Sequence, residues 1–187
     1  MEKNNFQFDK NMIDMIKSMI GKNLIKYRCD PFIFSNSVHL NVGIYIEDKI
    51  YLLSNKEEVI DYFGAKEDIG ILKIKECKDS EIKSGVVGVK QIDNPIDTLI
   101  KEIHIVQENQ KLFQKNILTY DYYLTRGLIF ILSDDREISF EKWGPFGEEI
   151  KINCGHNLLN KFDAIDDSNP DGDPNDVFKT TRSIIKI

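Results

Sequence analysis

The feature that most constrains the fold is an alternation of apolar and polar residues over residues 38–45. Val38, Leu40, Val42 and Ile44 fall on one face of an extended chain, and the residues between them fall on the other. A period of two is typical of a strand with one buried face, whereas a helix repeats every 3.6 residues. The chain also contains 11 Phe and 7 Tyr, and aromatic side chains fit a pleated sheet well. The sequence therefore predicts a protein dominated by strands.

Turn residues divide the rest of the chain into further strands. Residues 47–49 turn the first strand into a second one at 50–53, which makes a hairpin. The clearest hairpin joins residues 120–132 to residues 136–143 across the turn at 133–135. Other strands are predicted at residues 69–75, 85–92, 101–108, 149–154 and 177–187.

Helical patterns are few. Residues 9–20 place methionine and isoleucine at spacings of three and four, with Asp9 as a cap and Gly21 as the stop, so they predict an amphipathic helix that packs on the sheet. Ser54 or Asn55, followed by two glutamates and closed by Gly64, predicts a second, short helix. One helical turn is expected at residues 157–162.

These elements together predict one α+β domain over residues 1–187 in which strands dominate. We expect an antiparallel sheet or a partly open barrel of about nine strands, with an N-terminal amphipathic helix and one or two short helices. The 187 residues, 41% of them hydrophobic, are enough to bury a core.

Residues 166–176, called the acidic segment below, carry five carboxylates and no cation. The whole chain has 31 acids, 25 lysines and arginines, and a net charge of −6, so without the segment 26 acids face 25 bases. A nearly neutral body with one negative segment attracts a cationic partner. Two aromatic residues on a turn, Trp143 and Phe146, are candidate anchors for the same contact. The candidate partner-binding residues are Asp166, Asp167, Asp171, Asp173, Asp176, Trp143 and Phe146.

The same segment is a candidate calcium site, the only cofactor that the sequence suggests. Its alternating oxygens around one glycine are similar to the opening of an EF-hand loop. The candidate ligands are Asp167, Asn169, Asp171, Asp173 and Asp176. Phe178 stands where that loop needs a bidentate glutamate, and two prolines interrupt the pattern. An acidic loop without metal is the alternative, because Asp, Asn, Gly and Pro also compose solvated connections.

Other functional classes are disfavoured. A pI near 5.2 lacks the basic field that nucleic-acid binding requires. The longest clean apolar run is residues 128–132, far short of the roughly 20 residues of a membrane helix, and the N-terminus has no signal-peptide pattern. We therefore expect a cytoplasmic protein. No catalytic motif is present, so an enzyme would need separated residues such as Glu102, His104 and Tyr122 to converge.

Three short stretches, residues 125–130, 138–142 and 148–150, resemble segments of small uncharacterised bacterial cytosolic proteins. In size, acidity and lack of catalytic motifs the chain is similar to immunity proteins, which neutralise secreted bacterial toxins. The resemblance implies a non-enzymatic protein-binding module whose acidic surface docks on a basic toxin domain. A calcium-binding β domain and a small enzyme of unknown reaction remain the alternatives.

Overall fold

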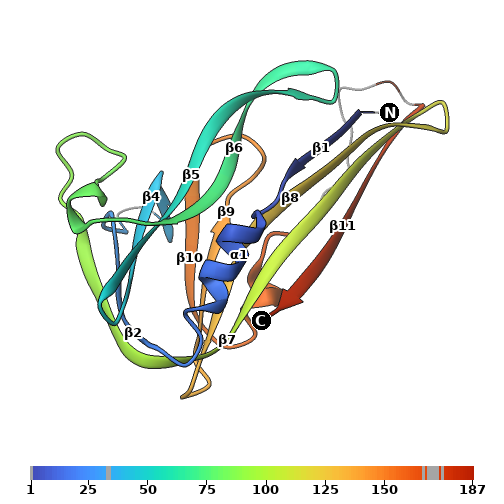
Figure 1. Ribbon diagram of the computed structural model, residues 1–187. Coiled ribbons are helices and arrows are strands. Elements are labelled where there is room, and N and C mark those ends of the chain that lie inside the picture. The colour runs from blue at the N-terminus through green and yellow to red at the C-terminus, as the bar shows by residue number, and fades with distance from the viewer. Residues whose placement is uncertain (1, 33–34, 166, 168–172, 174) are drawn as a thin grey trace.

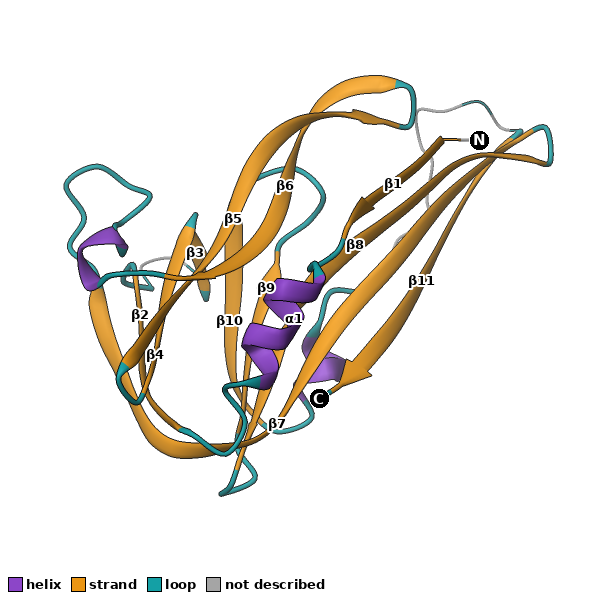
Figure 2. Cartoon of the chain, viewed as in Figure 1, coloured by secondary structure: helices purple, strands orange, loops and turns teal. Residues whose placement is uncertain are grey.

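The computed structural model describes residues 2–32, 35–165, 167, 173 and 175–187. Eleven strands form one mostly antiparallel sheet, and a single α-helix accompanies it (Figures 1 and 2). The strands are β1 (Glu2–Phe6), β2 (Asn23–Cys29), β3 (Ser37–His39), β4 (Asn41–Ile46), β5 (Lys49–Tyr62), β6 (Ala65–Glu76), β7 (Ile92–Gln114), β8 (Ile117–Leu132), β9 (Glu137–Lys142), β10 (Glu149–Gly155) and β11 (Asp176–Lys186). The helix is α1 (Lys10–Lys17), and two 3-10 turns are η1 (Asp79–Glu81) and η2 (Leu158–Lys161).

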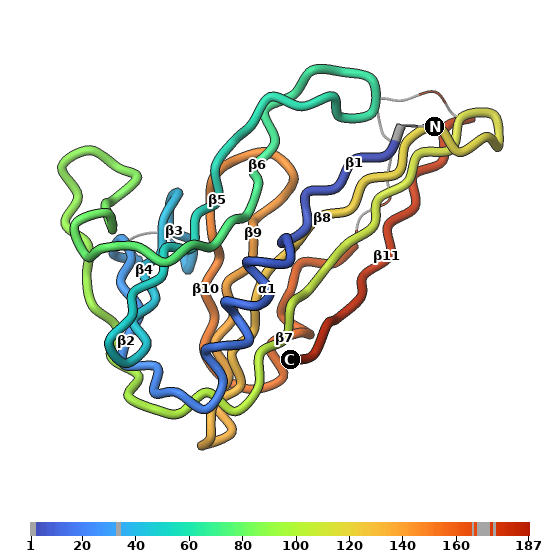
Figure 3. The backbone as a smooth tube through the Cα atoms, in the orientation of Figure 1, coloured from blue at the N-terminus to red at the C-terminus, as the bar shows by residue number. Residues whose placement is uncertain are grey.

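The 23-residue strand β7 joins the two halves of the sheet (Figure 3). Its first part pairs with β2, which continues through β4 and β5 to β6. The remainder pairs with β8, which continues through β9 and β10 to β3, and β11 also pairs with β7. β1 lies beside β8 in the one parallel pairing among the described strands. A strand this long accumulates twist, and the sheet curls so that its two halves face each other (Figure 1).

The core lies between these halves. Isoleucines and aromatics from both halves meet there, and Ile16 and Met19, from α1 and the turn after it, are fully buried among them. Asp9 caps the helix as predicted, because its carboxylate accepts a hydrogen bond from Met12 N at 2.8 Å. The helix ends at Lys17, earlier than expected, and irregular turns lead to Gly21, whose φ is +78°. The amphipathic helix is thus confirmed, whereas its predicted end is wrong.

The second predicted helix, over residues 55–63, is wrong. This segment continues β5, which pairs residue by residue with β6 from Tyr51–Glu76 to Tyr62–Ala65. Asn55 is fully buried in the strand, and Phe63 and Gly64 both take positive φ to make the tight turn. Cross-strand pairing therefore outweighed local helix signals, as is common for isolated short segments.

Other sequence predictions differ in detail. The predicted strand at 85–92 is a loop, and β7 begins only at Ile92. The predicted strand at 38–45 is divided into β3 and β4 at Leu40, whose φ is +64°. β1 and β2 were not expected, so the described sheet has eleven strands and not about nine. The hairpin of β8 and β9 is confirmed. The fold is β-dominated, as the composition indicated.

Candidate functional site

The turn between β9 and β10, residues 143–147, is held against the opposite half of the sheet. Asn55 on β5 donates its side-chain amide to Gly147 O at 3.1 Å and Glu149 O at 3.0 Å. Gly70 on β6 donates its N–H to Pro145 O at 3.2 Å. A Cβ atom on Gly70 would lie 2.4 Å from Gly147 O, so only glycine permits this approach. The turn is therefore a fixed platform.

Two large aromatic side chains stand on this platform. Trp143 is 49% exposed and Phe146 is 54% exposed. The Phe146 ring contacts the ring of Tyr62 edge-on, with 5.8 Å between centroids. Both aromatic residues that the sequence singled out are thus accessible, and Phe146 packs against Tyr62.

A β-bulge at Arg126 begins the polar network beneath the turn. Val106 pairs with Gly127 and Gln107 with Thr125, so Arg126 on β8 has no partner on β7. Bulges re-aim side chains in this way. A Cβ atom on Gly127 would lie 2.4 Å from Phe140 O, so the close approach of β9 requires this glycine. The bulge places the Arg126 guanidinium among carboxylates that come from distant parts of the chain.

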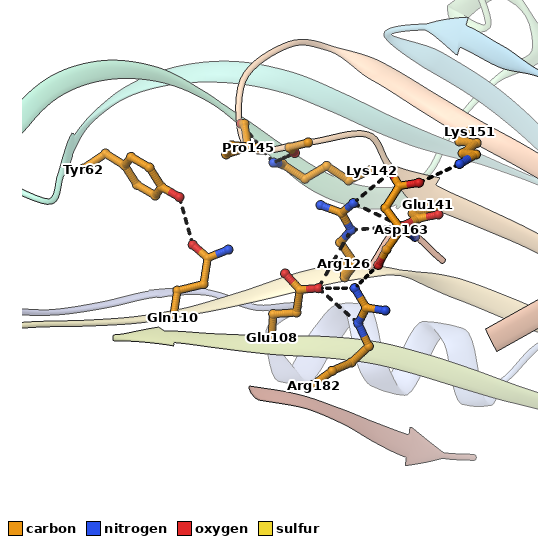
Figure 4. A network of polar contacts seen from close by, with 11 residues as sticks. Tyr62, Glu108, Gln110, Arg126, Glu141, Lys142, Pro145, Lys151, Asp163 and Arg182 are labelled. Carbon is orange, nitrogen blue, oxygen red and sulfur yellow. Dashed lines mark hydrogen bonds and ion pairs between the residues drawn. The ribbon is translucent and has the colours of Figure 1, made fainter. Parts of the chain in front are cut away.

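This network contains three cations and three carboxylates (Figure 4). The Arg126 guanidinium lies 3.1 Å from Glu141 Oε1 and 3.4 Å from Asp163 Oδ2. Arg182 on β11 donates to Glu108 Oε1 at 2.6 Å and to Asp163 O at 2.8 Å. Lys151 on β10 donates to Asp163 Oδ1 at 2.7 Å. Because opposite charges are paired, the network joins β7 to β11 without leaving a net charge.

Burial shifts two pKa values within or beside the network. Burial raises the pKa of Glu141, and the nearby Arg126 guanidinium opposes that rise. Burial lowers the pKa of Lys142 to about 7, and Arg126 lowers it further. The Lys142 ammonium donates to Gly144 O, and also to Pro145 O at 3.0 Å. Lys142 therefore holds the turn from inside, with both carbonyls as its acceptors.

A hollow of about 240 Å³ lies beside the network, and we call it the network hollow. Trp143, Ile165 and Thr180 line it together with both arginines. Asp167 of the acidic segment accepts a hydrogen bond from Thr180 N at 2.8 Å. Ile165 is 42% exposed and Asp167 is exposed. Trp143, Phe146, Ile165 and Asp167 thus form one surface, called the aromatic–acidic face below.

A second hollow, of about 660 Å³, also has Trp143 in its wall. We call it the Asp30 hollow, because Asp30 lines it while remaining only 5% exposed. Both carboxyl oxygens of Asp30 are buried and accept no hydrogen bond from the described residues. Polar groups buried in this way are rare, since most have a partner. The indole of Trp143 therefore separates two hollows of different chemistry.

The candidate calcium ligands are only partly within the described residues. Asn169 and Asp171, as well as Asp166 of the partner-binding set, lie outside them. Asp173 Oδ1 accepts from Asn175 N at 2.8 Å, and Asp176 Oδ2 accepts from Gln114 Nε2 at 3.2 Å. Across the described ranges no group of three acidic, histidine or cysteine side chains has a metal-binding arrangement. Calcium binding stays a prediction.

The residues named for an enzyme do not converge. Glu102 and His104 are in contact, with 2.6 Å between Oε1 and Nε2. Tyr122 pairs with Gln110, six residues along β7 from His104, which is roughly 20 Å at the rise of a strand. Its hydroxyl donates to Asp61 O at 2.6 Å. These three side chains therefore do not make one catalytic constellation.

Sequence reasoning missed the network and Asp30. The available signal was charge within apolar strands: Arg126 precedes a run of apolar residues, and Glu141 follows Phe140. Asp30 stands before Pro31, and no pattern in the sequence marks it as buried. Neither signal predicts which charged residues form ion pairs, because the partners are distant in the chain: Glu108 and Arg182 are 74 residues apart.

The sequence matches no protein-family model, and the comparisons with curated proteins and with solved structures give no match either. Within the described part of the chain, no helix is long and apolar enough to cross a membrane. The functional argument therefore depends on the residues of this chain alone.

Proposed function

We propose that this protein is a non-enzymatic protein-binding module, and that it acts as an immunity-type inhibitor of a basic partner such as a toxin domain. The observation that supports this most directly is the aromatic–acidic face. Trp143 and Ile165, far apart in the sequence, line one hollow, and Asp167 is bonded to Thr180 in the wall of that hollow. Half-exposed aromatics beside a hollow are typical anchors of protein interfaces, and exposed apolar groups that cluster with a polar rim mark interaction sites.

Charge supports a basic partner in particular. The acidic segment carries five carboxylates, and its described member on this face, Asp167, accepts a hydrogen bond from the backbone N–H of Thr180. A local negative potential accelerates association with a cationic surface and weakens as salt screens it. The aromatic residues then contribute contact area once the partner has arrived.

Site-specific photo-crosslinking in the native cytosol tests this proposal. A photoreactive phenylalanine analogue replaces Trp143, and a control variant carries it at Leu99, which is equally exposed at 49% on the other half of the sheet. We expect position 143 to capture one basic protein, and the yield to fall with added salt and in a variant with Asp167→Asn. Equal capture at both positions, or capture of an acidic protein, would contradict the proposal.

The inhibitor assignment has a second test. The captured protein is expected to be toxic when expressed alone, and co-expression of the wild-type chain is expected to restore growth. If a variant lacking the five carboxylates restores growth as well as the wild type does, the acidic segment is not required for inhibition. A captured protein without toxicity would remove the immunity-type role and leave protein binding.

A further inference from the structure

The Asp30 hollow combines three features that recognise an organic cation. It contains a buried carboxyl group whose two oxygens accept no hydrogen bond from the described residues, an aromatic wall and a volume typical of ligand sites. Its volume of about 660 Å³ falls within the roughly 300–1,000 Å³ of such pockets. We propose that this hollow takes a basic side chain, arginine before lysine, from the protein partner. This inference rests on the proposed function, because the partner supplies the side chain.

Asp30 carries the first step of the argument. The residue follows β2 directly, at the end of a strand whose last residue, Cys29, is fully buried. An ionised carboxylate in such a place costs several kcal/mol unless a donor compensates it. Neither oxygen receives a hydrogen bond from the described residues. A ligand with N–H donors would supply what the fold leaves out.

The charges around the hollow leave it negative. Asp30 and Glu149 line it with one cation, Lys151, whose ammonium is already bonded to Asp163 at 2.7 Å. His39, also in the wall, lies 3.3 Å from Glu148. A cationic ligand therefore meets two carboxyl groups and no free ammonium among the described lining residues.

Trp143 supplies the second recognition element. Indole is the aromatic group that attracts cations most strongly across its face, and Trp143 is 49% exposed while it lines the hollow. Arginine suits this pair better than lysine, because its planar fork donates two parallel hydrogen bonds to one carboxylate and stacks on aromatic rings. Two unmet oxygens on one carboxyl group match that fork.

The position of the hollow connects it to the aromatic–acidic face. Trp143 lines both hollows, so a partner centred on this indole reaches both from one docked position. The Asp30 oxygens are covered, so an entering guanidinium must turn the Asp30 side chain or displace the loop that contains Val86 and Val89, which also line the hollow. On the loop side of this wall Val86 is 46% exposed and Val89 is half-buried.

Fluorescence of the single tryptophan measures this binding directly. The probes are N-acetyl-arginine amide, N-acetyl-lysine amide and N-acetyl-citrulline amide, which keeps the shape of arginine without its charge. One side chain in a shallow site binds weakly, so we expect dissociation constants in the millimolar range, roughly −4 kcal/mol. We expect arginine to bind more tightly than lysine, and citrulline at least tenfold more weakly than arginine.

Variants locate the site. Asp30→Asn keeps the volume and removes the charge, and we expect it to weaken the arginine probe about tenfold, which is about 1.4 kcal/mol. Asp48→Asn, on the turn between β4 and β5, is the matched control and should leave binding unchanged. If Asp30→Asn does not fold, the comparison of arginine with citrulline on the wild type still decides the question. Equal binding of these two probes, or no binding of either, overturns the inference.

The outcomes also separate this inference from the proposed function. If a basic protein is captured at position 143 but Asp30→Asn leaves its affinity unchanged, the hollow is not its arginine pocket and only this inference fails. If arginine amide binds but no basic protein is captured, the hollow is a site for a small guanidinium or amine compound. In that case the protein-binding function fails, together with the partner as the source of the cation.

Discussion

Lys142 provides the sharpest test of the polar interior. Its side chain is 2% exposed, and burial lowers its pKa to about 7 from 10.5. The pKa in the unfolded chain is the ordinary one, so the unfolded state binds more protons between these two values. The free energy of unfolding therefore rises with pH from about 7 towards 10.5, and the penalty for burying the ammonium is fully present below the folded pKa.

The magnitude follows from this difference in proton binding. Each pKa unit corresponds to about 1.4 kcal/mol, and the folded state loses its proton progressively above pH 7. Between pH 7 and about 8.5 the stability is expected to rise by roughly 1–2 kcal/mol through Lys142 alone. The pH range stops at about 8.5 to avoid titration of the cysteines. Burial raises the pKa of Cys29 to about 12, so the stability falls once the pH exceeds the thiol pKa of the unfolded chain.

The measurement is urea unfolding of the wild type, Lys142→Met and Lys179→Met across this pH window. Methionine keeps the length of the side chain without the charge, and Lys179 is an exposed lysine on β11. We expect the stability of wild type minus that of Lys142→Met to grow by roughly 1–2 kcal/mol from pH 7 to about 8.5. Lys179→Met should run parallel to the wild type. A difference that stays constant with pH would refute a depressed pKa at Lys142.

Three further outcomes are expected. Arg182→Met leaves the buried Glu108 without its closest cation and should cost about 3–5 kcal/mol in urea unfolding, whereas a loss below about 1 kcal/mol would show that the pair does not stabilise the fold. Gly70→Ala should lower the free energy of unfolding by about 1–3 kcal/mol, because the added methyl group crowds Gly147 O, and it should shift the tryptophan fluorescence. An unchanged spectrum would mean that the turn at residues 143–147 keeps its position without a glycine at residue 70. Asp167→Asn should slow association with the captured basic protein at low salt and leave the dissociation rate nearly unchanged; an unchanged association rate would exclude Asp167 from steering.

The strands were predictable where the pattern was local. Residues 128–132 form an uninterrupted apolar run because the strand has both faces covered. The alternation over residues 38–45 located strands but not their burial, because Leu40 divides the segment into β3 and β4 and residues 42–46 are all buried. The Asp9 cap was predictable because the signal is local: its carboxylate accepts from the N–H of Met12, three residues along the chain. Local signals of this kind need no knowledge of the partner strand.

Long-range pairing decided what the sequence did not disclose. The two glutamates after Asn55 satisfy the local rules for a helix start, yet each pairs with a residue of β6. The direction of the Arg126 side chain is set by a bulge, which depends on the register between β8 and β7. The spacing of residues within one segment does not predict that register. The hollow around Asp30 needs β3 beside β10, and these strands are joined by more than 100 residues of chain. The local sequence around Asp30 therefore carries no sign of the hollow that this residue lines.

The pairing of charges in the network bears on the proposed role of the acidic segment. Arg126 and Arg182 line the network hollow, Lys151 is bonded to Asp163 in its wall, and each of these cations is paired with Glu108, Glu141 or Asp163. A cation already bonded to a buried carboxylate cannot neutralise a second one without giving up that bond, which costs more than a surface pair returns. The network thus holds Asp163, three residues before the acidic segment, and its three cations are already bonded within the network. Under the proposed function, Asp167, which is bonded to Thr180 N, would steer a basic partner from a position that needs no ordering on association.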